Sequence, residues 1–257
     1  MSNPTFIWYE LITPDPAAAA RFYETVVGWR TAPFEGGMDY TILWAGDHGV
    51  GGMGPLPGDM RESGLKPGWY GYVGVPDADA AAAGIRSLGG TVLRAPDDIP
   101  GVGRYAVAAD PTGAAFMLLA PKPMDSPPPA PPARMTPGNV GWHELNAGDG
   151  DAAFSFFSRL FGWSQVGAFS MGAHGTYVLW SPDGGEMIGG MMTRMEGTPA
   201  PTWVYYFVVE GIDAAAERIA ANGGTIVNGP MPVPDGSFIV QAVDAQGAAF
   251  ALVSATR

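Results

Sequence analysis

Alternating apolar and polar positions open the chain, and a helical pattern follows them. Residues 5–12, TFIWYELI, have the alternation typical of a strand with one buried face. Asp15 suits the cap of a helix and Pro16 suits its first position. The helix is predicted over residues 17–27, AAAARFYETVV, and Gly28 is placed to end it.

Short strand-like segments come next, and then the same plan restarts. Strand candidates surround Trp29, TILW and GVGGMG, with glycine and proline between them. The restart predicts a strand at 69–75, a helix at 77–90 and three strands at 91–95, 104–110 and 114–120. Each half of the chain therefore contains two βαβββ modules. The fold class is α+β, with four such modules in all.

The whole pattern occurs twice. An offset of 134 residues relates the pairs Trp8 and Trp142, Glu10 and Glu144, Asp15 and Asp149, Trp69 and Trp203, and Asp110 and Asp244. Only the middle departs from it, where YTILW at 40–44 matches TYVLW at 176–180 at an offset of 136. Such internal repetition predicts a duplicated domain.

A proline-rich stretch separates the copies. We expect a first domain at 1–121, a linker at 122–137 and a second domain at 138–257. The linker is too rich in proline for a sheet and favours extended polyproline conformation. It is long enough to let the second half dock on the first. We expect a monomer of two pseudo-symmetric halves or a homodimer.

The paired modules, the opening ELITPDPAAAARFYETVVGW and the closing DPTGAAFML resemble the vicinal oxygen chelate superfamily. Glyoxalase I, extradiol dioxygenases, fosfomycin-resistance enzymes and bleomycin-resistance proteins belong to it. The resemblance covers 5–121 and 139–254. It implies two tandem glyoxalase/bleomycin-resistance-like domains, each a curved mixed sheet around a cleft. It says little about activity, because one fold hosts many chemistries.

The resemblance also implies where metal ligands would lie. The first strand carries Trp8 and Trp142 at the position usual for a ligand histidine, and the last strand carries Met117 and Ala251 where a glutamate is usual. The remaining position falls near Trp69 and Tyr70, and near Trp203 and Val204. None of these side chains suits a divalent cation. We expect no metal and no other cofactor; a metal held by Glu10 with loop histidines has no support at these positions.

Two repeated acids are the candidate catalytic residues. Strand alternation places Glu10 on the same face as Trp8, and Glu144 on the same face as Trp142. A poorly hydrated carboxyl group has a raised pKa, which suits a general acid or base. The alternative is structural: each acid accepts hydrogen bonds or pairs with an arginine across the sheet. Arg104 is the expected partner of Glu10 or of an anionic ligand.

Aromatic residues dominate the expected cleft walls, which favours a planar or apolar small-molecule ligand. The predicted ligand-binding residues are Trp8, Trp69, Tyr70, Arg104, Met117, Trp142 and Trp203. Alternatively, half of the aromatic residues simply fill the core. His143, on the face opposite Glu144, is expected to be structural.

Composition removes several classes of function. The formal charge of −12 disfavours nucleic acid and anionic membrane partners. The absence of cysteine removes disulfides, thiolate nucleophiles and zinc-thiolate sites. No leader-like start and no long apolar window occur, so we expect a cytoplasmic protein with no membrane partner.

Four interpretations remain at this point. The favoured one is a metal-free protein of the bleomycin-resistance type that binds a small apolar or aromatic molecule. The second is a metal-dependent glyoxalase- or dioxygenase-like enzyme. The third is a metal-free lyase, isomerase or hydrolase with Glu10 as general base, and the fourth is a scaffold. The sequence names neither the ligand nor the functional cleft.

Overall fold

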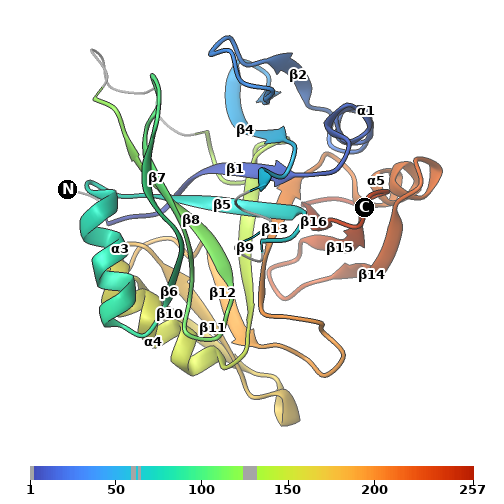
Figure 1. The fold of residues 1–257 in the computed structure, drawn as a ribbon. Helices are drawn as coiled ribbons and strands as arrows, with labels where there is room; N and C mark the ends of the chain where they lie inside the picture. The colour runs from blue at the N-terminus through green and yellow to red at the C-terminus, as the bar shows by residue number, and fades with distance from the viewer. Residues whose placement is uncertain (1–2, 59–61, 63–64, 124–131) are drawn as a thin grey trace.

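The computed structural model describes residues 3–58, 62, 65–123 and 132–257, which form two halves of the same topology (Figure 1). The first half contains β1 (Phe6–Ile12), α1 (Pro16–Val26), β2 (Arg30–Pro33), β3 (Thr41–Ala45), β4 (His48–Gly54), β5 (Gly68–Gly74), α3 (Ala78–Ser87), β6 (Thr91–Ile99), β7 (Gly103–Ala109) and β8 (Ala115–Pro121). The second half contains β9 (Val140–Ala147), α4 (Gly150–Phe161), β10 (Ser164–Ser170), the short 3-10 helix η1 (Gly172–His174), β11 (Thr176–Ser181), β12 (Gly189–Thr193), β13 (Thr202–Val208), α5 (Ile212–Ala221), β14 (Thr225–Pro232), β15 (Phe238–Val243) and β16 (Ala249–Ser254).

Each half is one mixed sheet of eight strands. The order is β2-β3-β4-β1-β5-β8-β7-β6 in the first half and β10-β11-β12-β9-β13-β16-β15-β14 in the second. The two modules of a half join through the antiparallel pairs β1–β5 and β9–β13. The α+β class with four βαβββ modules is confirmed. Half of the predicted linker, residues 124–131, lies outside the described residues, so the linker boundaries stay a prediction.

The helices begin where the sequence predicts. The carboxylates of Asp15, Asp77 and Asp149 each accept the backbone N–H three residues on, at 2.9 to 3.0 Å. Such caps satisfy donors that the first turn leaves open. Gly162 ends α4 in the left-handed region at φ 78°, which a glycine adopts without steric cost. No helix of the described residues is long and apolar enough to cross a membrane.

The core lies between the two sheets. One continuous cluster of buried residues includes Phe6 and Trp69 from the first half and Trp203 and Phe207 from the second. We call the sheet faces that meet in this cluster the inner faces, and the opposite ones the outer faces. Smaller clusters on the outer faces contain residues of one half only. The two halves therefore bury their largest aromatic side chains in a common core.

Each half also contributes a helix to the other half's sheet. From α1, the Tyr23 hydroxyl donates to Asp244 at 3.1 Å, and Phe22 packs 5.8 Å from Phe250. From α4, Phe157 packs 5.3 Å from Phe116. In Figure 1, α1 lies beside α5 and α3 lies beside α4. The helices thus lock the halves together in addition to covering their own sheets.

The predicted offset of 136 residues in the middle of the repeat is wrong by one. Thr41 pairs with Met53, and Val178 occupies the corresponding place opposite Met191, so the offset between β3 and β11 is 137. A shift of one residue exchanges the faces of a strand. Leu43 therefore corresponds to Trp180, and both are fully buried, whereas Trp44 is only half-buried.

Tyr9 and His143 meet at the centre of the interface between the halves. They are counterparts at the 134-residue offset, and the Tyr9 hydroxyl lies 2.6 Å from His143 Nε2. His143 Nδ1 lies 2.8 Å from the Ile188 carbonyl, which can only accept, so Nδ1 carries the proton and Tyr9 donates to Nε2. The ring also stacks on Phe6 at 4.8 Å. His143 belongs to the core, as strand alternation indicated.

Because of this burial, we expect acid to weaken the fold through His143. Burial lowers the pKa of His143 from 6.5 to about 4, despite the hydrogen bond to Ile188. The unfolded chain then binds a proton before the folded chain does, so stability is complete above pH 6.5 and falls as the pH approaches 4. From pH 7.5 to pH 5 the loss is about 2 kcal/mol.

Urea unfolding of the native chain and of His143→Gln across this range measures the effect. Glutamine can keep both hydrogen bonds but does not titrate. The difference in unfolding free energy between the two proteins should narrow or reverse as the pH falls. Parallel pH profiles would refute the role given to His143.

Candidate functional site

Residues of β1 and β5 build the outer face of the first half. Leu11 of β1 is fully buried on the inner face, so Trp8 and Glu10 lie on the outer face. Directly paired residues share a face, and here Glu10 pairs with Tyr70 and Trp8 pairs with Tyr72. Glu10 is half-buried among these aromatic rings.

Glu10 has a tyrosine on each side. The Tyr72 hydroxyl donates to its Oε2 atom. Trp8 Nε1 donates to the Tyr40 hydroxyl at 3.0 Å, and the nearby Glu10 charge adds to burial in raising the pKa of Tyr40. The Tyr40 ring lies over Gly52, where any side chain would overlap it. Gly52, part of the GVGGMG segment, is therefore needed for close packing.

The second half repeats this arrangement around Glu144. Trp142 Nε1 donates to the Tyr177 hydroxyl at 2.9 Å, and that hydroxyl donates to Glu144 Oε2 at 3.0 Å. The Tyr177 ring lies over Gly190, as Tyr40 lies over Gly52. A tryptophan, a tyrosine and a glutamate are thus placed together on each outer face.

The two carboxyl groups differ in their remaining partners. Glu144 Oε1 accepts from Asn146 at 3.2 Å and from Gln241 at 3.3 Å, so both of its oxygens are bonded. Glu10 Oε1 has no hydrogen-bond partner among the described residues, and it is not one of their fully buried polar atoms. The counterparts of Asn146 and Gln241 are Ile12 and Val107, which cannot donate from their side chains.

Burial raises the pKa of both acids. For Glu10 desolvation dominates and the Tyr72 hydrogen bond opposes it. For Glu144 desolvation again dominates, opposed by hydrogen bonds from Asn146, Tyr177 and Tyr206. No ion pair of the described residues includes either acid. A carboxyl group with these properties can accept a proton from a ligand or donate one to it.

Trp69 and Trp203 do not lie beside the acids. Trp69 pairs with Leu11 and Trp203 pairs with Leu145, which places both on the inner faces. Trp69 is 6% exposed and donates to the Tyr23 hydroxyl at 2.8 Å, and Trp203 is 3% exposed. The strand register, uncertain by one residue in the sequence, puts both in the core, which corrects their predicted placement in the cleft walls beside the acids.

Arg104 is also not a partner of Glu10. It forms ion pairs with Asp79 at 2.6 Å and with Asp98 at 3.0 Å. Arg104 is in β7, Asp79 is in α3 and Asp98 is in β6, so these pairs tie the helix to the hairpin at its side. The Arg104 guanidinium, predicted to pair with Glu10 or with an anionic ligand, pairs with Asp79 and Asp98 instead.

The other predicted residues lie on the outer faces. Tyr70 is half-buried and its hydroxyl donates to the Lys66 carbonyl at 2.5 Å. Met117 is fully buried in the outer cluster of the first half, opposite Tyr72, and Trp142 is half-buried in that of the second. Sequence reasoning missed Tyr40 and Gln241. The one signal for Gln241 was its polar side chain inside the otherwise apolar strand FIVQAV. Tyr40 was missed because the predicted offset of 136 aligned it with Thr176 and not with Tyr177, its counterpart at the observed offset of 137.

The donor set does not fit a metal. Within the described ranges, no three His, Asp or Glu residues lie close enough together to hold an ion. The family's ligand positions carry indole, thioether and methyl groups, which are poor ligands for hard cations.

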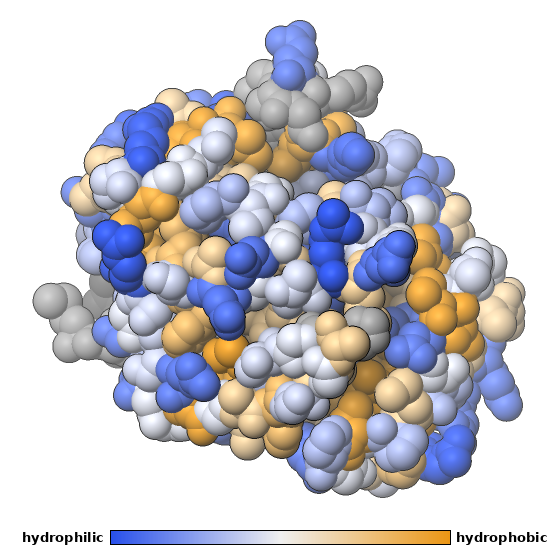
Figure 2. Space-filling model, turned by 90° about the horizontal axis from the view of Figure 1, so that it is seen from below, coloured by the Kyte–Doolittle hydropathy of each residue, from blue (hydrophilic) through white to orange (hydrophobic). Residues whose placement is uncertain are grey.

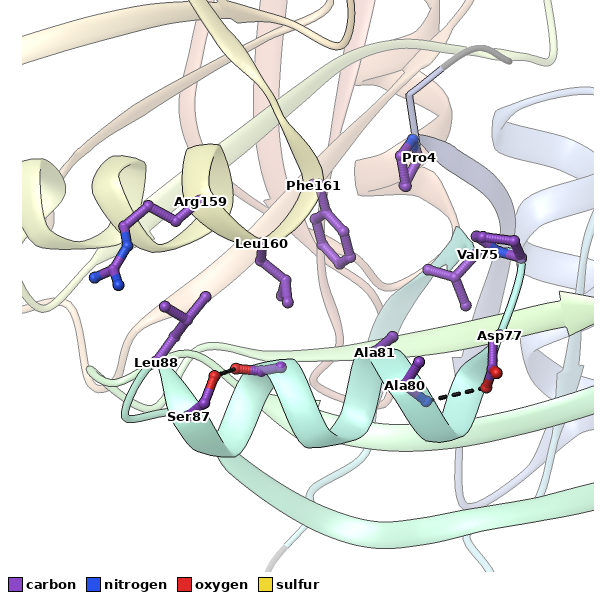
Figure 3. Close-up of a pocket in the computed structure, with 12 residues that line it drawn as sticks. Pro4, Val75, Asp77, Ala80, Ala81, Ser87, Leu88, Arg159, Leu160 and Phe161 are labelled. Carbon is purple, nitrogen blue, oxygen red and sulfur yellow. Dashed lines mark hydrogen bonds between the residues drawn. The ribbon is translucent and has the colours of Figure 1, made fainter.

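A groove of about 480 Å³ lies on the other side of the first half, between α3 and α4 (Figure 3). Val75, Leu88 and Leu160 form part of its apolar lining. Between α1 and α5, the corresponding place is crossed by Arg218, which donates to the Val26 carbonyl at 3.0 Å. Gly84 is the counterpart of Arg218 and lines the groove, so no side chain crosses the groove from this position.

Comparison with known proteins agrees with the duplicated plan. A family model described as "Glyoxalase-like domain" matches residues 8–119, and one described as "Glyoxalase/Bleomycin resistance protein/Dioxygenase superfamily" matches residues 139–252. A protein of Streptomyces sp. (strain C5) named "Anthracycline biosynthesis protein DauV" is 30% identical over 262 residues, covering 96% of this chain and 91% of that protein. The chain belongs to the glyoxalase/bleomycin resistance protein/dioxygenase superfamily.

Other members of the superfamily match more locally or by fold alone. "Putative glyoxylase CFP32" of Mycobacterium tuberculosis is 46% identical over 123 residues, 46% of this chain and 45% of that protein. Homoprotocatechuate 2,3-dioxygenase from Arthrobacter globiformis superposes with a TM-score of 0.68 at 14% identity, over 98% of this chain and 80% of that one. The Mn(II)-bound glyoxalase from Novosphingobium aromaticivorans gives 0.63 at 15%, over 100% and 83%. These structures establish the fold only.

Because its pKa is raised, ionised Glu10 should reduce the stability of the fold. The folded chain holds the Glu10 proton more tightly than the unfolded chain, so protonated Glu10 contributes to the unfolding free energy at low pH. This contribution is lost as the pH rises above the ordinary glutamate range. We expect Glu10→Gln to raise the unfolding free energy at pH 8 by about 1 kcal/mol, the usual size of a stabilising substitution. Chemical denaturation at pH 8 and pH 4 measures it. A variant less stable than the native chain at pH 8 would contradict this assignment.

Proposed function

We propose that this protein binds a small, planar aromatic molecule on the outer face of its first half, without a metal. The observation that carries the proposal is the Oε1 atom of Glu10, which has no hydrogen-bond partner among the residues that the structure describes and lies beside a wall of aromatic side chains. A ligand hydroxyl or amine donates to this oxygen. Its ring system lies against the neighbouring side chains.

The surroundings of Glu10 suit such a ligand. Trp8, Tyr40 and Tyr70 are half-buried, so each offers part of an aromatic ring to a ligand. Aromatic side chains bind planar rings through stacked or edge-on contacts. Ile12 and Val107 are fully buried apolar residues at the positions where the second half has amide side chains, so they give no hydrogen bond to Glu10. The first half therefore binds the ligand, and Glu144, whose oxygens are both bonded, has a structural role.

The relatives support this class of ligand. Two curated relatives that match nearly the whole chain are named anthracycline biosynthesis proteins. An anthracycline has a planar fused-ring system with phenolic hydroxyl groups, which combines the apolar surface and the donor that the Glu10 site would recognise. We take a phenol-bearing polycyclic compound as the ligand class for this chain.

A second candidate function is proton transfer by Glu10 as a general acid or base. The raised pKa of its carboxyl group favours this reading, since a base is most effective when its pKa approaches the working pH. In such a reaction Glu10 takes a proton from carbon or oxygen of the bound molecule, and the Tyr72 hydroxyl steadies the carboxylate. Binding and proton transfer would use the same contacts.

A fluorescent anthracycline, daunorubicin, is the probe for the binding site. We expect it to quench the fluorescence of Trp8 on binding, and Glu10→Gln to weaken binding by roughly 10- to 100-fold, because a hydrogen bond to a charged acceptor is lost. Titration followed by tryptophan fluorescence and by calorimetry measures both. Equal affinity in the native chain and Glu10→Gln would disprove the role of Glu10.

Glu144→Gln is the matched control, since Glu144 occupies the same place in the second half. It should change the affinity less than about 3-fold, within the effect of a remote substitution. If Glu144→Gln weakens binding and Glu10→Gln does not, the assignment of the two halves is reversed. No binding by the native chain would remove the proposed ligand class.

A further inference from the structure

The two sheets end in four edge strands, β2, β6, β10 and β14. An edge strand presents unpaired backbone N–H and C=O groups, and proteins usually protect it with proline or charge. Three of these edges are protected in this way: β2 has Arg30 and Pro33, β6 has Pro96 between charged residues, and β14 has Pro230 and Pro232.

The β10 edge has neither protection. Its sequence is SQVGAFS, and the whole β10–β11 hairpin, 164–181, contains no Asp, Glu, Lys or Arg. The chain carries 13 basic and 25 acidic residues, so this neutral stretch is unusual for it. Val166 is 39% exposed and Phe169 is 47% exposed. From below, the surface shows apolar patches separated by hydrophilic residues rather than one large apolar face (Figure 2).

Comparison of the two halves shows which backbone groups are open. Pro33 pairs with Thr41, and Ala168 occupies the same place opposite Val178. The Phe34 N–H donates to the Tyr40 carbonyl at 2.8 Å, so Phe34 and Tyr40 are a hydrogen-bonded pair. Because hydrogen-bonded and non-hydrogen-bonded pairs alternate in an antiparallel ladder, the backbone groups of residue 33 point away from β3. Proline is tolerated there because no ladder bond is lost. The N–H of Ala168 therefore points away from β11, along the open edge.

A second observation gives the same orientation. Met171 N–H bonds inward to the Gly175 carbonyl at 2.8 Å, which by alternation turns Ser170 and Ala168 outward. The strand register shifts between Gln165 and Gly167, so the regular open segment is 167–170. Ala168 and Ser170 present their N–H and C=O groups along it.

We propose that a second copy of this chain pairs antiparallel with β10 across a twofold axis near Phe169. In this arrangement Ala168 and Ser170 of each copy exchange backbone hydrogen bonds, and both copies cover exposed Phe169. Two molecules that each carry a charge of −12 repel each other. Because β10 has no charged residue, two copies can approach along it without like charges at the contact. The short segment implies a dimer that forms and dissociates with concentration.

Sedimentation velocity of the full chain from about 1 to 200 µM, a range that brackets a weak association, tests the dimer. We expect the mass to rise from 26.8 kDa toward twice that value. Ala168→Pro copies the residue of the first half and should raise the dissociation constant by roughly 30-fold, because two backbone hydrogen bonds are lost per dimer. A mass of 26.8 kDa at every concentration would overturn the proposal.

Two further variants keep the outcome clear. Phe169→Lys places a positive charge on each copy beside the axis and should also shift the mass toward the monomer. If circular dichroism shows that Ala168→Pro does not fold, Phe169→Lys is the variant that tests the dimer. Pro33→Ala changes the matching position of the first half, where Arg30 remains, and should leave the mass unchanged. A dimer that survives Phe169→Lys, or that Pro33→Ala alone alters, would show that another surface holds it.

Discussion

The packing of the two inner sheet faces against each other is the constraint on which the rest of the structure depends. Phe6, Trp69, Trp203 and Phe207 lie in one buried cluster that neither half could cover alone. Burial of each large apolar side chain contributes roughly 1.5 to 3 kcal/mol. This cluster uses one face of both central strands, β1 and β9. Because side chains alternate along a strand, every second residue of β1 and β9 must point to the outer face, and both glutamates are among these residues.

The same packing explains why duplicate positions have different roles. Tyr9 and His143 are counterparts, yet near the centre of the interface they form one hydrogen bond with each other. Gly71 and Tyr205 are also counterparts, and the tyrosine hydroxyl accepts the glycine N–H at 2.7 Å. Two identical large residues could not share such places. The interface itself therefore required the halves to diverge.

On the outer faces the divergence concerns chemistry. Both halves keep a tryptophan that donates to a tyrosine, a glycine beneath that tyrosine ring, and a glutamate on the same face. Only the second half adds the amides of Asn146 and Gln241, which complete the hydrogen bonds of Glu144. Burial raises the pKa of both acids, but only Glu10 also has a carboxylate oxygen without a hydrogen-bond partner among the described residues. Such a stability cost is typical of functional sites.

The sequence by itself determined the duplicated βαβββ plan, because alternation, aspartate caps and glycine stops are local signals. It also placed Trp8 and Glu10 on one face and excluded the family's metal ligands by residue type. Only the tertiary structure decided that Trp69 belongs to the core, since a register error of one residue reverses a strand. It alone showed that Arg104 pairs with Asp79, that Tyr40 bonds to Trp8 and that Gln241 bonds to Glu144, because these contacts join segments distant in sequence.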